Sequence, residues 1–117
     1  NAVKHFRFST RGKRRIHEKP DLVHLVACKP WLDAELLEVD PELIVAMGAT
    51  AARSVLGPGI KVTKQRGEIL LRETPLGERR FMVTVHPSSI LRARDDREAA
   101  FRALVEDLKI AADAVRA

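Results

Sequence analysis

The pattern of apolar and polar positions divides the chain into short predicted strands and helices. Residues 43–47 form a continuous apolar run that ends at a glycine, which is typical of a strand buried on both faces of a parallel sheet. Residues 67–73 and 81–85 predict two further strands. Asn1–Lys4 predicts the end of a strand whose beginning lies upstream of this sequence. In contrast, residues 5–20 are polar and basic without any period, and we expect a long loop there.

Helical segments are predicted between and after these strands. Asp21 can cap a helix over residues 22–28. Pro30 then breaks or restarts it, and residues 31–39 continue as a second helical segment. A short helix is expected at 50–56. The last helix has the clearest pattern, because seven apolar residues recur at helical spacing and three acids stand at its positive N-terminal end. These are Phe101, Leu104, Val105, Leu108, Ala111, Ala112 and Val115, with Asp95, Asp96 and Glu98. Because strands and helices alternate, the predicted class is α/β with a mainly parallel sheet.

Composition and charge narrow the class of protein. With 117 residues, 45% of them apolar and 32% charged, the chain fits one domain with a core, and neither disorder nor membrane insertion is expected. Cys28 is the single cysteine, which excludes an internal disulfide and suggests a reducing, cytoplasmic setting. The net charge is +5, and basic residues crowd the first thirty positions. Such a surface suits phosphate, although a solvated loop is equally compatible with it.

Two polar clusters follow predicted strands, at the edge where open α/β sheets bind their ligands. One is Asn1–His5, which leads into the basic loop. The other is His86-Pro87-Ser88-Ser89-Ile90-Leu91-Arg92. Two bulky apolar residues on a loop suit a wedge pushed into a base stack, with Arg92 holding a phosphate. Alternatively, Ile90 and Leu91 fold back into the core, and His86 is bonded only to backbone.

Two further residues can carry chemistry. His17 ends the run Gly12-Lys13-Arg14-Arg15-Ile16-His17, and neighbouring cations favour neutral imidazole, which is nucleophilic. From the residues alone, a solvated basic loop is the preferred interpretation. Cys28 is by itself most typical of a small buried apolar residue.

Five segments in this order resemble the C-terminal half of the family 4 uracil-DNA glycosylases, specifically the UdgX branch. They are Asn1-Ala2-Val3-Lys4-His5-Phe6, Lys13-Arg14-Arg15-Ile16-His17, Ala27-Cys28-Lys29-Pro30-Trp31-Leu32, Met47-Gly48-Ala49-Thr50-Ala51-Ala52 and His86-Pro87-Ser88-Ser89-Ile90-Leu91-Arg92. The resemblance spans essentially the whole chain, and the Lys-Arg-Arg-Ile-His loop carries the assignment to the branch. It implies a three-layer α/β/α glycosylase fold, of which residues 1–117 form the C-terminal part of a single domain.

The resemblance also implies roles for individual residues. Asn1 would read the uracil edge, and His86 would bond uracil O2 and stabilise the departing anion. His17 would capture the anomeric carbon and leave the protein bonded to the abasic sugar, while Arg15 positions its loop. Substrate contacts from Ser88, Ser89, Leu91 and Arg92 are implied as well.

A [4Fe–4S] cluster is the cofactor that the resemblance implies, with Cys28 as one ligand. The family has a cysteine close to His5, so His5 is the expected replacement, and two further ligands are expected upstream. The expected partners are uracil-containing DNA, single-stranded DNA being favoured, and the missing N-terminal half as a separate chain or a cleaved segment. No membrane partner is expected. Two alternatives stay open: an ordinary hydrolytic uracil-DNA glycosylase, and a non-catalytic basic module that binds DNA.

Overall fold

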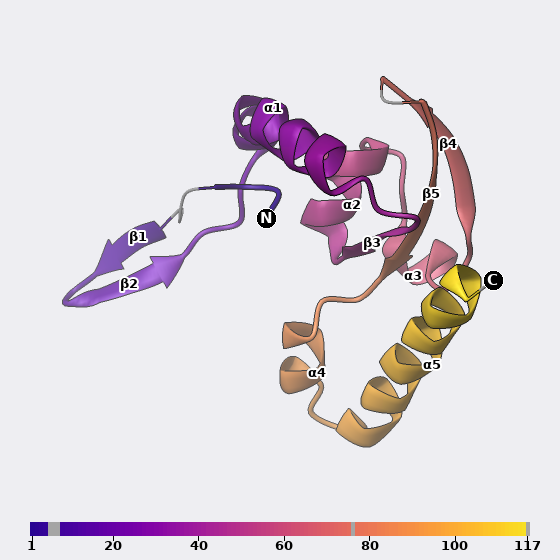
Figure 1. The fold of residues 1–117 in the computed structure, drawn as a ribbon. Coiled ribbons are helices and arrows are strands. Elements are labelled where there is room, and N and C mark those ends of the chain that lie inside the picture. Colours follow the sequence, from indigo (N-terminus) through magenta and orange to yellow (C-terminus); the bar gives the residue numbers. More distant parts are fainter. Residues whose placement is uncertain (5–7, 76, 117) are drawn as a thin grey trace. The chain divides into compact units, whose positions relative to one another are not determined.

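The computed structural model describes residues 1–4, 8–75 and 77–116, except for the side chain of His17 (Figure 1). The chain divides into two compact units, residues 1–39 and residues 40–117. Among the described residues, no helix has both the length and the apolar character needed to cross a membrane.

A β-hairpin occupies most of the segment that was predicted to be a loop. Strands β1 (Phe8–Arg11) and β2 (Arg14–His17) pair antiparallel, with Phe8 opposite His17 and Arg11 opposite Arg14. Gly12 opens the two-residue turn with φ +63°, a conformation that glycine adopts without strain. The loop prediction was therefore wrong, because cross-strand hydrogen bonds and a tight turn stabilise a hairpin whose sequence lacks an apolar face. Residues 1–4 form no strand, which corrects the prediction for Asn1–Lys4.

Helix α1 (Leu22–Val39) is continuous, which corrects the predicted break at Pro30. It begins directly after Asp21, as expected, and the Asp21 carbonyl accepts the backbone N–H groups of His24 (3.0 Å) and Leu25 (3.3 Å). A proline inside a helix removes one backbone hydrogen bond and crowds the preceding turn. Here the Lys29 ammonium and the Asp33 carboxylate form an ion pair (2.6 Å) across that turn, which favours continuation of the helix.

The second unit contains a three-stranded sheet in the order β3-β5-β4. Strand β3 (Ile44–Met47) lies parallel to β5 (Gly77–Thr84), and β4 (Leu70–Thr74) lies antiparallel to the other edge of β5. All three strands were predicted, and the α/β class is confirmed. The described sheet is mixed, with one parallel and one antiparallel pairing, because a short turn joins β4 directly to β5.

The described residues of the second unit form four helices: α2 (Ala49–Leu56), α3 (Val62–Gln65), α4 (Ser88–Arg92) and α5 (Arg97–Val115). Their core includes buried Ala46, Ala52 and Val83. Helix α5 was predicted, and the carboxylate of Asp96 caps it by accepting the Ala99 N–H (3.0 Å). The prediction missed α3 and α4, because single-turn helices are too short to show a period.

Polar side chains join α5 to the sheet at two places. The Asp107 carboxylate accepts hydrogen bonds from the Thr84 hydroxyl (2.6 Å) and from Arg66 Nε (2.8 Å). Thr84 is fully buried and Asp107 is 8% exposed. Further along, the Arg80 guanidinium donates to the Ala114 carbonyl (2.9 Å) near the end of the helix. Strand β5 therefore holds α5 through Thr84 and Arg80.

Candidate functional site

His86 lies two residues beyond the carboxyl end of β5, and its ring orientation is fixed by the first turn of α4. The Ser88 backbone N–H donates to His86 Nδ1 (3.1 Å), and the Ser88 hydroxyl oxygen lies 2.9 Å from the same nitrogen. A backbone N–H can only donate, so Nδ1 acts as the acceptor. The neutral ring must then carry its proton on Nε2. His86 is exposed, and it therefore offers a hydrogen-bond donor at the edge of the sheet where α/β proteins bind ligands.

The remaining polar residues of this segment support that arrangement. Arg92 Nη1 donates to the Ser88 hydroxyl (3.2 Å), which leaves the hydroxyl proton free to point at His86 Nδ1. The Ser89 hydroxyl donates to the His86 carbonyl (2.8 Å). Ser88, Ser89 and Arg92 thus lie in one hydrogen-bonded cluster with His86. The segment was predicted to be a loop, and that was wrong: these contacts close a turn of helix.

Gly48, directly after the carboxyl end of β3, lies close to His86. Its N–H donates to the Thr84 carbonyl (2.8 Å), so the ends of β3 and β5 stay joined beyond the ladder. Its backbone angles, φ 95° and ψ 166°, fall in a region that is essentially restricted to glycine. A Cβ atom at this position would lie 3.2 Å from His86 Cβ, closer than the ordinary van der Waals range. His86 is therefore seated against a backbone that has no room for a side chain.

Ile90 and Leu91 have opposite surroundings, which separates the two alternatives for this pair. Ile90 is 8% exposed and belongs to the core, whereas Leu91 is 71% exposed. The core alternative holds for Ile90, and a wedge role remains available to Leu91 alone. Leu91 and Arg92 are the last two residues of α4, and the Arg92 guanidinium reaches back to the Ser88 hydroxyl.

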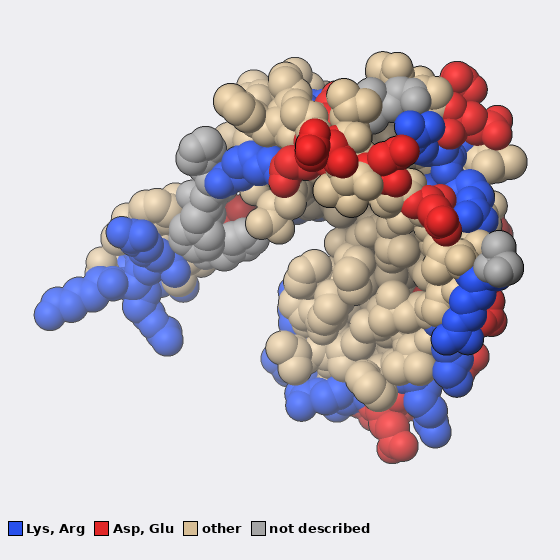
Figure 2. Space-filling model, in the orientation of Figure 1, with Lys and Arg blue, Asp and Glu red and all other residues tan. Residues whose placement is uncertain are grey.

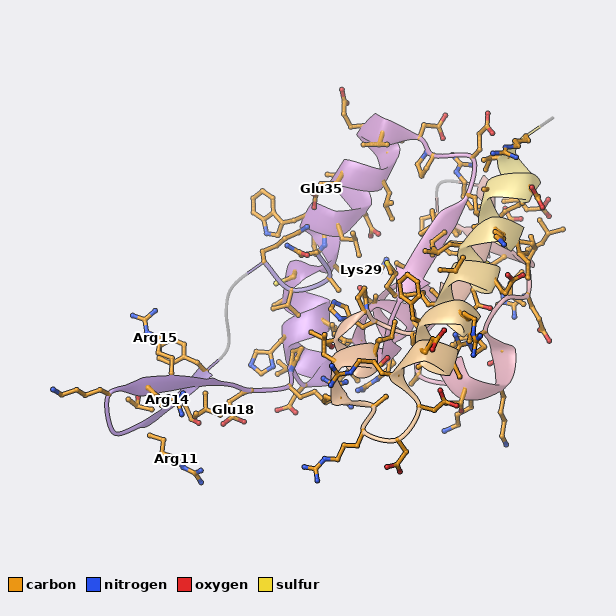
Figure 3. The ribbon with its side chains drawn as sticks, turned by 90° about the horizontal axis from the view of Figure 1, so that it is seen from below. Arg11, Arg14, Arg15, Glu18, Lys29 and Glu35 are labelled. Carbon is orange, nitrogen blue, oxygen red and sulfur yellow. The ribbon has the colours of Figure 1, made fainter. Side chains whose placement is uncertain are left out.

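The hairpin of the first unit concentrates positive charge. Arg11, Lys13, Arg14 and Arg15 are all exposed, and no acidic residue lies between 8 and 17. Figure 2 shows the lysine and arginine side chains extending from this region, and Figure 3 shows Arg15 and Arg11 pointing to opposite sides of the hairpin. The Arg15 guanidinium lies over the Phe8 ring, 4.8 Å from its centroid. His17 is placed in β2 by its backbone, but its side chain lies outside the described atoms.

Cys28 is buried in α1, and its sulfur accepts the Lys4 backbone N–H (3.4 Å). The Lys4 ammonium also pairs with the Glu35 carboxylate, and this hydrogen bond lowers the pKa of Glu35. The segment containing exposed Asn1 is thus attached to α1 at two points within this unit. His5, the second predicted ligand, lies outside the described residues. Within the described part of the chain, no group of three His, Cys, Asp or Glu residues could hold a metal ion.

Sequence reasoning missed three features that shape these sites: Gly48 beside His86, the Phe8–Arg15 pair, and the buried Thr84–Asp107 bond. One of them carried a signal. Asp107 stands three residues after Leu104 and four before Ala111, both of which are buried. A carboxylate on the apolar face of a helix needs a hydrogen-bond partner, so the spacing of Asp107 predicts a buried polar contact. The Phe8–Arg15 pair depends on strand register, and the contact of Gly48 with His86 depends on how two loops approach each other. The periodicity of the sequence shows neither.

Comparison with known proteins places the chain in a family. Residues 1–109 match the Uracil DNA glycosylase superfamily, and the chain belongs to it. More narrowly, it is similar to the type-4 uracil-DNA glycosylase of Thermotoga maritima, with 34% identity over 84 residues. That match covers 71% of this chain and 41% of the relative, so the chain spans less than half of the relative's length.

Proposed function

We propose that the protein excises uracil from DNA and then becomes bonded to the abasic sugar through His17. The observation that carries the excision step is the orientation of His86, whose Nδ1 is taken by the Ser88 N–H, so that Nε2 is the donor. As the N-glycosidic bond breaks, its electron pair passes to the uracil ring. Negative charge then develops on uracil O2, and a donor fixed beforehand at that oxygen stabilises the departing anion.

The second step of the proposal is capture of the sugar. Bond cleavage leaves an oxocarbenium-like anomeric carbon, which accepts an electron pair from a neutral imidazole nitrogen of His17. The second ring nitrogen then releases its proton, which restores a neutral ring bonded to the sugar. The exposed cations around His17 in the hairpin support this proposal, since they suit DNA phosphates on either side of the target. Arg15 is the proposed positioning residue of this loop, and Asn1 the group that reads the uracil edge.

Contacts that open and hold the DNA complete the proposal. Leu91, exposed at the end of α4, is the proposed wedge that fills the place of the extruded base, and Arg92 beside it would pair with a phosphate. Ser88 and Ser89 are proposed to act mainly by holding His86 and its backbone. Single-stranded DNA is the preferred substrate, because its bases need no unpairing before extrusion.

We also propose that Cys28 is a ligand of a [4Fe–4S] cluster. Its thiolate fits, since it is buried and already accepts an N–H, and hydrogen bonds to sulfur tune such clusters. Four ligands are needed, and His5, which lies outside the described residues, is the proposed second one. When bound, the cluster would supply structural cross-linking around α1. Absorption at the blue end of the visible spectrum should be lost in both Cys28→Ala and His5→Ala. Its retention in His5→Ala would argue against His5 as a ligand.

A denaturing gel tests the main proposal. The protein, incubated with uracil-containing single-stranded DNA and heated, should give a shifted, heat-stable band. The intact mass of the protein should rise by the mass of the oligonucleotide less that of the released uracil. His17→Ser should abolish this band, whereas His24→Ser, a half-buried histidine of α1, should leave it unchanged. An unchanged band in His17→Ser would rule out covalent capture by this residue.

The same gel separates the alternatives. Free uracil without a shifted band would indicate an ordinary hydrolytic glycosylase, an outcome that the similarity to a type-4 enzyme keeps in view. In that case His86→Ala should still slow uracil release, because the leaving base is common to both mechanisms. Neither free uracil nor a shifted band would indicate a DNA-binding module without chemistry.

A further inference from the structure

The hairpin carries an aromatic side chain that its charge alone does not explain. Phe8 is 42% exposed, and every residue of β1 is exposed. The Arg15 guanidinium lies 4.8 Å from the ring centroid, within the range of a cation–π contact. The strand register explains this contact, since Arg15 pairs with Thr10, two residues along from Phe8 on the same face.

This pair stabilises the hairpin, but stabilisation does not require an exposed aromatic ring in a strongly basic hairpin. Cross-strand pairs of many types contribute, at about 0.2–1 kcal/mol each. What distinguishes Phe8 is the charge of its hairpin, since residues 8–17 contain no acid and include Arg11, Lys13, Arg14 and Arg15. Aromatic rings among positive charges are the combination by which proteins hold single-stranded nucleic acid: bases stack on the rings, and cations pair with phosphates.

We propose that Phe8 and Arg15 form a stacking platform for one unpaired base of single-stranded DNA. Arg14 and Arg11, on the opposite face of the hairpin, hold the phosphates of the same strand. The platform tolerates any base, because every base has a π-face, and it discriminates against duplex, whose bases are already stacked. The inference rests on the proposed function only in taking DNA as the partner. It assigns to the hairpin a second task beside the chemistry of His17.

The test measures binding of uracil-free oligonucleotides, so it is independent of base excision. Phe8→Ile keeps a strand-forming apolar residue and removes the ring, whereas Phe8→Trp keeps a ring. Anisotropy of a labelled single strand should show Phe8→Ile binding at least about fivefold more weakly, with Phe8→Trp close to the unchanged protein. Phe101→Ile removes an aromatic that is 56% exposed on α5, and it should leave binding unchanged.

Salt dependence separates stacking from charge. Phe8→Ile removes no phosphate contact, so the slope of log K against log salt should stay the same. Arg14→Gln should reduce the slope by about 0.7, the value for one phosphate contact on a single strand. Tryptophan fluorescence can report base stacking at position 8, because Trp31 is the single tryptophan and can be replaced. In the Phe8→Trp, Trp31→Phe double variant, emission should be quenched by single strands and much less by duplex.

Two results would overturn the platform. The first is Phe8→Ile binding single strands as tightly as the unchanged protein. The second is equal weakening in Phe8→Ile and Phe8→Trp, since a ring would then not matter. If the platform fails while uracil release persists, the proposed function stands. If the unchanged protein binds no single-stranded DNA at all, the proposed function fails together with it.

Discussion

Removing the buried bond between Thr84 and Asp107 should destabilise the second unit by an amount that depends on which partner is changed. The Thr84 hydroxyl donates to Asp107 at 2.6 Å, and Arg66 Nε donates to the same oxygen at 2.8 Å. Thr84→Val preserves shape and removes one hydrogen bond to a charged acceptor, which costs about 2 kcal/mol. Asp107→Ala leaves the buried hydroxyl without an acceptor and also breaks the ion pair.

The second change should therefore cost more, about 3–4 kcal/mol. The ion pair contributes to this cost, because the Arg66 and Asp107 side chains are only 27% and 12% exposed, and the change leaves a largely buried guanidinium without its carboxylate. In the double variant no hydroxyl remains to be stranded. The two single effects should then exceed the double effect by about 2 kcal/mol, which is the coupling between the two side chains.

Urea unfolding followed by far-UV circular dichroism measures these values, because α5 gives a large share of the helical signal. Tryptophan emission would be the wrong probe, since Trp31 belongs to the unit of residues 1–39. The slope of the transition should stay constant across the variants, which shows that only stability has changed. Strictly additive single effects, or an Asp107→Ala cost below about 1 kcal/mol, would refute the reasoning.

Two further substitutions test the segment around His86, and one titration tests the ion pair of Glu35. Gly48→Ala should slow uracil release roughly tenfold more than Gly57→Ala, because the two glycines share strained backbone angles but only the first would contact His86. If both variants slowed uracil release equally, the close approach of Gly48 to His86 would not explain the loss of activity. Leu91→Ala should weaken action on duplex more than on single strands; similar losses on both would count against a wedge. The lowered pKa of Glu35 means that its ion pair with lysine is present above the ordinary carboxyl pKa and is lost as pH falls through the lowered value. NMR titration of Glu35 checks this, and a midpoint at the ordinary value would contradict it.

The elements that could be predicted are those in which periodicity reports burial. Residues 97–115 repeat apolar side chains at helical spacing, and residues 44–47 form an apolar run, so both elements were expected. The hairpin at 8–17 was not, because its stability comes from pairing between strands that are exposed on both faces. The break predicted at Pro30 was wrong because the hydrogen bond that proline removes is outweighed by the other contacts of an 18-residue helix.

Part of the candidate site could also be predicted. The sequence around His86 indicated a functional segment, because hydroxyl residues, bulky apolar residues and an arginine follow the histidine closely. It could not show which ring nitrogen carries the proton, because that depends on the approach of the Ser88 N–H. It also treated Ile90 and Leu91 as a pair, and the turn of α4 buries one of them and exposes the other.

The attachment of α5 to β5 has a consequence for motion. Thr84 and Arg80 are four residues apart on the strand, and their partners Asp107 and Ala114 are seven apart on the helix. These spacings correspond to about 13 Å of strand and about 10 Å of helix, so both bonds are satisfied in one antiparallel register. A slide of α5 by one turn, about 5.4 Å, would break both bonds together. Helix α5 is therefore held on the sheet at two points, and the segment between Thr84 and Arg97, which carries His86, joins these two attached elements.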